Sequence, residues 1–184
     1  MASSYSSDLS LELITTGEKA GLWGTITNTN LQILQQAASG YVAVPMTSGS
    51  DVTLSLADGS DTANGKNLYL KLTGTMTASI SLIIPTATSG GTATRTYIIE
   101  DTTDRTTANN YTINIKTAGS ATPVPLPEGA NIIVRSDGTD TVLAFIKPGI
   151  KDITAATITA YTAVNGDQVV VDTQANAVTI TLPI

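Results

Sequence analysis

The sequence predicts a mainly β protein of 184 residues, in which a segment of strand, loop and short helix precedes a β-sandwich or barrel-like domain. Apolar and polar residues alternate in many short runs, which is typical of strands that bury one face. Pairs that favour turns, such as Asp58-Gly59 and Asp137-Gly138, separate these runs. Only one stretch, 31–38, has apolar residues at helical spacing. Many short strands at nearly regular intervals favour a sandwich or a barrel.

Residues 1–40 are predicted to form a segment of their own. Leu9, Leu11 and Leu13 alternate with polar residues, so they predict a short strand that carries these three side chains on one face. Residues 16–21 contain two glycines and predict a loop after that strand.

The helix is predicted over 31–38, where Leu31 and Leu34 lie on the same face. Side-chain oxygens within 27–30 are candidates to cap its first amide groups. Gly40 is expected to end it. A helix of three turns or fewer is marginal alone, so it needs a surface to pack against.

Trp23 is the single tryptophan, and it lies between Gly21 and Gly24 in the predicted loop. Two interpretations stay open for it. The side chain either forms a hydrophobic clasp between loop and helix or acts as an anchor at an interface, where tryptophan is enriched. Both hold if the N-terminal segment is itself an assembly element.

Residues 41–147 are predicted to form the β domain. Its strands are expected at the alternating or continuous apolar runs 52–56, 68–73, 80–84, 97–99, 111–116, 132–134 and 141–146. Asp137-Gly138 lies between the last two runs and is a strong signal for a β-hairpin.

Residues 148–160 are predicted to be a linker, and residues 161–184 the start of a further β module. Two apolar runs, 167–172 and 178–183, suggest a hairpin. Two strands alone are marginally stable at best. We therefore expect that partner chains complete this unit or that the natural protein continues past Ile184.

The composition excludes several kinds of chemistry, because the chain contains no histidine and no cysteine. A Ser-His-Asp or Cys-His catalytic site, a thiolate or imidazole metal site and a disulfide all need one of these residues. No cofactor site is predicted.

The charge pattern bears on partners. The net charge is −6 and the nine basic residues are scattered, so binding to a nucleic acid backbone is not expected. No apolar run approaches the length of a membrane-spanning helix, so membrane insertion is not expected either. The first 15 residues lack the basic and apolar regions of a secretory signal.

Several acidic residues are candidate metal ligands or catalytic groups. Asp58 with Asp61, and Asp137 with Asp140, supply fewer oxygens than the six to eight that calcium takes, and they are interpreted as turns. Glu100-Asp101 could form a carboxylate pair for glycoside hydrolysis. We interpret it as a solvated turn, and we predict neither a metal site, a catalytic residue nor an enzyme.

Residues 1–40 carry more apolar surface than such a short segment can bury within itself, and exposed apolar patches of that kind mark interfaces. We expect this segment to dock to a partner, with its strand adding to a partner edge and Trp23 as an anchor. The residues expected to dock are Leu9, Leu11, Leu13, Trp23, Leu31 and Leu34.

The N-terminal residues carry a family resemblance. Ser4 to Leu13, then TGEKAGLWG at 16–24 and TNTNL at 27–31, resemble the N-terminal signature of tail-fibre-like structural proteins of tailed bacteriophages, common in phages of marine bacteria and cyanobacteria. The signature reads roughly L-x-L-x-x-x-x-x-G-E-x-x-G-x-W-G-x-x-T-N-x-N-L. The runs from Gly40 to Gly138 resemble the β module that follows it, and Asp167 to Pro183 resembles the start of the next module.

The resemblance implies a virion structural protein, an intertwined homotrimer whose N-terminal part attaches the fibre to a tail, adaptor or baseplate protein for host adsorption. A host receptor would be reached only through a distal continuation of the chain. Three alternatives stay open: the N-terminal part of a tailspike with a polysaccharide-degrading domain beyond Ile184, a head or neck fibre, and a capsid cement protein.

Overall fold

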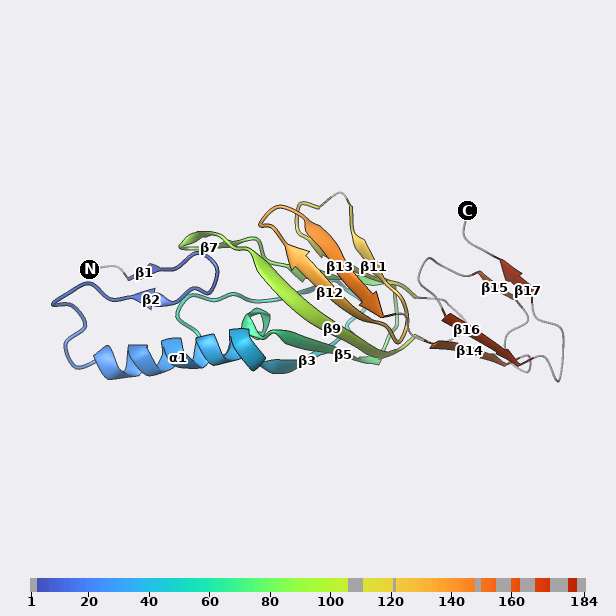
Figure 1. The fold of residues 1–184 in the computed structure, drawn as a ribbon, viewed down its shortest axis with the longest axis horizontal. Helices are drawn as coiled ribbons and strands as arrows, with labels where there is room; N and C mark the ends of the chain where they lie inside the picture. Colours follow the sequence, from blue (N-terminus) through green and yellow to red (C-terminus); the bar gives the residue numbers. More distant parts are fainter. Residues whose placement is uncertain are drawn as a thin grey trace.

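The computed structural model describes residues 3–105, 111–120, 122–147, 150–154, 160–162, 168–172 and 179–181. The mainly β fold predicted from the sequence is confirmed. The molecule is elongated (Figure 1): the N-terminal segment with its helix occupies one end, two sheets fill the middle, and the last short strands lie at the other end.

The N-terminal segment forms a two-stranded sheet of β1 (Ser4–Tyr5) and β2 (Glu12–Leu13), paired antiparallel with Ser4 opposite Leu13. The continuous strand predicted through Leu9, Leu11 and Leu13 is wrong. Ser10 interrupts it with a left-handed backbone, φ 53°, that non-glycine residues rarely adopt. Its buried hydroxyl donates to the carbonyl oxygen of Leu56 at 3.1 Å, which ties this bend to the β domain.

The helix α1 spans Trp23–Ser39, so it begins eight residues before the predicted start at 31, and Trp23 is its first residue rather than a loop residue. The N-cap is Leu22, and no side chain caps the helix. The predicted start is too late because Asn30, one of the residues expected to cap the helix, lies inside it. Its side-chain amide binds the backbone of Glu12 instead.

The helix ends at Gly40, as predicted, but not through a left-handed glycine. Gly40 is extended, with φ −67° and ψ 143°, and its N–H donates to the Gln36 carbonyl oxygen at 2.8 Å. A Cβ at this position would lie 2.5 Å from Oδ1 of Asn67 and 2.6 Å from the Gln36 carbonyl oxygen. Glycine is required by this close approach rather than by the backbone angle.

The β domain is a sandwich of two sheets, both open within the described part of the chain. The larger sheet has the order β13-β12-β9-β5-β3 and the smaller β11-β10-β6-β4. Their bounds are β3 Tyr41–Pro45, β4 Val52–Thr53, β5 Tyr69–Thr75, β6 Ile80–Ile84, β9 Arg95–Asp104, β10 Ile113–Thr117, β11 Val124–Leu126, β12 Asn131–Ser136 and β13 Thr141–Lys147.

The chain alternates between the two sheets from β3 to β10. Strands β3, β5 and β9 therefore pair in parallel in the larger sheet, and β4, β6 and β10 do so in the smaller one. Parallel neighbours need a crossover connection, and here each crossover runs through the opposite sheet. The strands β11, β12 and β13 then pair antiparallel.

The core lies between the two sheets and consists mainly of aliphatic side chains, and Tyr97 is the one fully buried aromatic ring among the side chains that the structure describes. Its hydroxyl donates to the carbonyl oxygen of Gly65 at 2.8 Å, in the short helix η1 (Asn64–Lys66). The core residues include Val44, Met46, Leu70, Leu72, Met76, Leu82, Ile84, Ile99, Ile113, Ile115, Ile132 and Val134.

The alternating runs located most strands correctly. The hairpin at Asp137-Gly138 is confirmed, since Ser136 pairs with Thr141 and Gly138 has φ 91°. The largest difference is β9, which extends to Asp104 and so places Glu100 and Asp101 inside a strand. A small hairpin of β7 (Ala87–Thr88) and β8 (Gly91–Thr92) turns at Ser89 and Gly90.

The C-terminal strands are β14 (Ile150–Thr154), β15 (Ala160–Thr162), β16 (Gln168–Asp172) and β17 (Thr179–Thr181). β14 lies within the range predicted to be a linker. The hairpin predicted for the last two strands is wrong, because β16 pairs in parallel with β14, and β17 in parallel with β15.

Candidate docking surface

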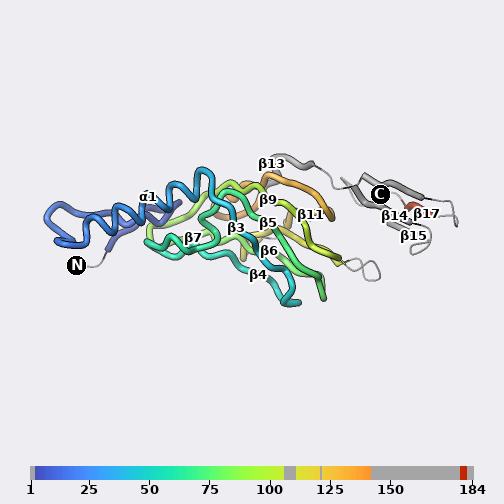
Figure 2. The backbone as a smooth tube through the Cα atoms, turned by 90° about the horizontal axis from the view of Figure 1, so that it is seen from below, coloured from blue at the N-terminus to red at the C-terminus, as the bar shows by residue number. Residues whose placement is uncertain are grey.

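The large exposed hydrophobic side chains gather at one end of the molecule. Among the described side chains they all lie between residues 13 and 41, with exposed fractions from 43% for Leu34 to 64% for Trp23. The helix α1 lies along the long axis in both views (Figures 1 and 2), and in Figure 1 this end is far from the C-terminal strands. We call the six residues the N-terminal apolar surface: Leu13, Leu22, Trp23, Leu31, Leu34 and Tyr41.

Four of the six residues expected from the sequence belong to this surface. Leu9 and Leu11 do not, because both are partly buried. Leu22 and Tyr41 were missed. Leu22 was assigned to a loop and Tyr41 to the start of a strand; the exposure of Tyr41 follows from the place of β3 at the sheet edge, which the sequence does not reveal.

Trp23 is the most exposed of the large hydrophobic side chains. A ring that is 64% exposed is not enclosed between a loop and a helix. The exposure of Trp23, the first residue of α1, therefore favours the anchor interpretation over the hydrophobic clasp.

Two faces of α1 differ sharply. Ile33 is fully buried, and Ile26 and Ala37, at helical spacing from it, are partly buried on the same side. Beside this face runs an apolar stripe of Leu31, Leu34 and Ala38, all exposed, with Trp23 and Thr27 in line toward the N-terminus. The helix contains no charged residue from Trp23 to Ser39.

Asn30 fixes the helix to β2. Its Oδ1 accepts the backbone N–H of Glu12 at 3.0 Å, and its Nδ2 donates to the Glu12 carbonyl oxygen at 2.9 Å. Both backbone groups of Glu12 are thus occupied. Strand addition to a partner, expected from the sequence, would have to displace this side chain.

Two carboxylates hold the rest of the segment. Glu12 forms an ion pair of 2.8 Å with Nζ of Lys19, and this hydrogen bond lowers the pKa of the Glu12 carboxyl below its usual value. Asp8 accepts the backbone N–H of Thr94 at 2.8 Å, which lowers the pKa of Asp8 in the same way. These contacts tie Glu12 to the loop before α1 and Asp8 to the residue that precedes β9.

Glu100 and Asp101 do not form a solvated turn, and that prediction is corrected. Successive side chains of a strand point to opposite faces, so the two carboxylates do not share a site. Glu100 is partly buried and accepts the Tyr69 hydroxyl at 3.0 Å. Asp101 is 3% exposed and faces the interior.

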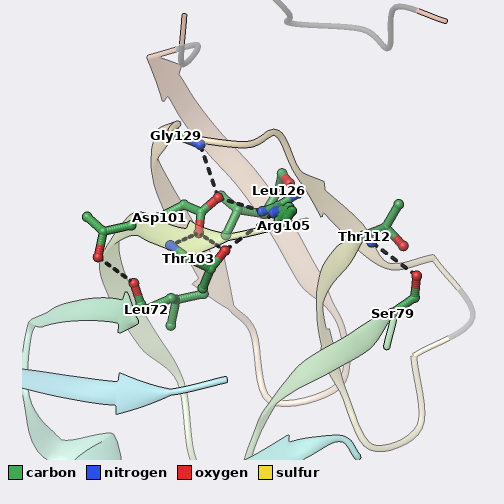
Figure 3. A network of polar contacts seen from close by, with 9 residues as sticks. Leu72, Ser79, Asp101, Thr103, Arg105, Thr112, Leu126 and Gly129 are labelled. Carbon is green, nitrogen blue, oxygen red and sulfur yellow. Dashed lines mark hydrogen bonds and ion pairs between the residues drawn. The ribbon is translucent and has the colours of Figure 1, made fainter. Parts of the chain in front are cut away.

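The Asp101 carboxylate is fully engaged (Figure 3). One oxygen accepts from Nη2 of Arg105 at 2.6 Å and from the Gly129 N–H at 3.1 Å; the other accepts the N–H and the hydroxyl of Thr103. Arg105 also donates to the Leu126 carbonyl oxygen at 2.9 Å. The network joins β9 to β11 and the turn after it, and it leaves no carboxylate oxygen free to act on a substrate.

Asp137 acts in a turn, as the sequence predicted, whereas Asp58 accepts the hydroxyl of Ser89, which is distant in the sequence. Asp137 accepts the N–H groups of Thr139 and Asp140 at 2.9 and 2.8 Å, and these bonds lower the pKa of the Asp137 carboxyl. Within the described residues, no group of three or more acidic side chains is arranged to hold a metal ion.

Lys66 is the most unusual polar residue of the β domain. Its side chain is fully buried, and Nζ has no hydrogen-bond partner among the described residues. Burial lowers the pKa of Lys66 to about 8, opposed in part by the negative charge of Asp58. An unpaired buried ammonium destabilises the fold rather than supporting it.

No protein-family model matches this chain, and neither does any curated protein or any solved structure. In the part of the chain that the structure describes, no helix has the length and hydropathy that a membrane crossing requires. The class that the structure itself defines is an elongated, mainly β protein with an exposed apolar surface at its N-terminal end.

Proposed function

We propose that this chain is the N-terminal part of a tail fibre of a tailed bacteriophage, a virion structural protein whose residues 1–40 attach to the particle. One observation carries the proposal: among the side chains that the structure describes, the large exposed hydrophobic ones all lie between Leu13 and Tyr41. Apolar surface left open in this way marks an interface. The resemblance of 4–31 to the signature of tail-fibre-like proteins supports the same assignment.

The arrangement along the long axis also supports this function. The N-terminal apolar surface and the C-terminal strands lie at opposite ends (Figure 1). A fibre needs such polarity, because one end binds the particle while the other points outward. We propose that the partner is a tail, adaptor or baseplate protein, and that the fibre is a homotrimer.

The proposal contains no catalytic step. The carboxylate that the fold buries, Asp101, is saturated by four hydrogen bonds, and its neighbour Glu100 faces the other side of the sheet. Both therefore act as structural groups in this proposal.

Attachment is tested by adding purified protein to particles that lack the fibre. Trp23→Ala should weaken binding by about 2–4 kcal/mol, which is roughly 30-fold to 900-fold, if the ring is a hot spot of the interface. Thr139→Ala, in the exposed turn between β12 and β13, is the matched control and should bind normally. Normal attachment of the Trp23→Ala protein would contradict the anchor role.

A further inference from the structure

The apolar stripe on α1 has the spacing of a helix-packing seam. Thr27, Leu31, Leu34 and Ala38 follow one another at intervals of four, three and four residues. The spacing of 11 residues from Thr27 to Ala38 thus covers three turns, about 3.67 residues per turn, which is a period that also lets parallel helices keep one face toward each other. Leu31, Leu34 and Ala38 are exposed to solvent in the described structure, and Thr27 is partly buried.

The edge of the larger sheet continues the stripe. β3 follows α1 after Gly40 along the long axis (Figure 1), and it is the last strand on its side of the sheet, so its outer edge is unpaired in the described structure. Tyr41 is exposed at the start of this edge and stacks on Tyr69, with 5.7 Å between ring centres. Exposed strand edges are places where other chains add.

The chemistry of the stripe favours a second copy of this chain as its occupant. Parallel copies around a common axis bring identical residues together, which is unfavourable for charged side chains. The helix has no charge from Trp23 to Ser39, so identical stripes meet without repulsion. An uncharged helix also offers nothing for a partner selected by opposite charge.

We propose that copies of this chain pack in parallel through the stripe of Leu31, Leu34 and Ala38 together with the edge of β3. The inference rests on the homotrimer of the proposed function and names its interface. It also divides the N-terminal apolar surface: Leu13, Leu22 and Trp23 stay free for the particle, while Leu31, Leu34 and Tyr41 face other copies. The stripe spans less than two heptads, so the edge of β3 is needed to extend the contact.

The test uses disulfide crosslinking of the full chain, which contains no cysteine of its own. A disulfide forms only when two Cα atoms approach within about 7 Å. In parallel copies joined through the stripe, Leu34→Cys should yield dimers on a denaturing gel after mild oxidation. Gln32→Cys, also exposed but on another side of the helix, is the matched control and should remain monomeric.

The outcomes separate the inference from the proposed function. Crosslinking of Leu34→Cys but not of Gln32→Cys supports the interface, and Leu31→Cys repeats the test should the first variant fail to fold. An oligomer in light scattering that crosslinks equally at both positions, or at neither, overturns this interface and leaves the homotrimer standing. A monomer overturns both, whereas particle attachment is decided by Trp23→Ala.

Discussion

The β-sandwich and the N-terminal helix treat the same kinds of side chain in opposite ways. In the sandwich, Leu82 and Ile113 are fully buried between the sheets, whereas on the helix Leu31 and Trp23 are more than half exposed. The sandwich shows that this sequence can bury large apolar side chains completely. The exposure on α1 is therefore a property of that surface, and it is the pattern expected where another protein binds.

The largest effect is expected at the polar centre of the buried region. Asp101→Ala leaves the Arg105 guanidinium in the interior without its counter-charge, and breaking a buried pair costs about 3–5 kcal/mol. The free energy of unfolding in urea measures this loss. Glu100→Ala, on the other face of β9, is the control and should cost much less; equal losses would show that burial does not distinguish the two carboxylates.

A matched pair of leucines tests the comparison directly. Leu82→Ala opens a cavity in the core and should lower the free energy of unfolding by about 2–5 kcal/mol. Leu13→Ala, at a side chain that is 51% exposed, should change it by less than about 0.5 kcal/mol. If Leu13→Ala instead lowers the free energy of unfolding by more than about 1–2 kcal/mol, then Leu13 stabilises the isolated protein and is not a docking residue.

Lys66 gives a pH dependence with a definite sign. Its pKa is about 8 in the folded protein and 10.5 without burial, so between these values the unfolded chain holds a proton that the folded protein has lost. Stability therefore rises as the pH increases from about 8 to about 10. Below that range the buried ammonium costs on the order of 1–3 kcal/mol.

Lys66→Met should remove this penalty, so it raises the free energy of unfolding at pH 7 and flattens the rise above pH 8. Thermal or urea unfolding across that pH range measures both changes. Lys71→Met, whose side chain is part-exposed on β5, should leave the rise intact. Identical pH profiles for wild type and Lys66→Met would disprove the assignment.

The smallest effect is expected where the helix meets β2. Asn30→Ala removes two hydrogen bonds to the Glu12 backbone, each worth about 0.5–1.5 kcal/mol. The loss should be local, seen as faster amide hydrogen exchange at Glu12 with little change in the melting of the sandwich. Asn28→Ala, an exposed position on the same helix, should leave this exchange unchanged.

The sequence predicted most sandwich strands well because they bury one face, and alternation reports that directly, as in 68–73 and 111–116. It failed where the deciding contact is distant. The buried carboxylate of Asp101 accepts hydrogen bonds from Arg105 and from Gly129, which is distant from it in the chain. Arg105 in turn donates to the carbonyl oxygen of Leu126. The parallel pairing of β16 with β14 likewise joins strands that do not follow one another in the sequence, so a turn signal between consecutive strands does not predict it.

The sequence predicted only part of the docking surface, because contacts between distant residues also decide which side chains are exposed. Apolar periodicity identified Leu31 and Leu34, but it does not say which face of a helix other elements cover. The early start of α1 was missed because the residue expected to cap it, Asn30, binds the Glu12 backbone instead. The exposure of Tyr41 is not predicted by the sequence, because it depends on β3 being an edge strand.

The alternation of the chain between the two sheets also bears on the order of folding. Neither sheet is built only from strands that follow one another in the sequence. For example, β4 lies between β3 and β5 along the chain, but it belongs to the opposite sheet. Such separated pairings slow the search for the native state, since loops must close before contacts reward them. During synthesis, the chain from β3 to β9 would remain without a complete core until β10 and β12 leave the ribosome. The sandwich is then expected to form late and in a single cooperative step.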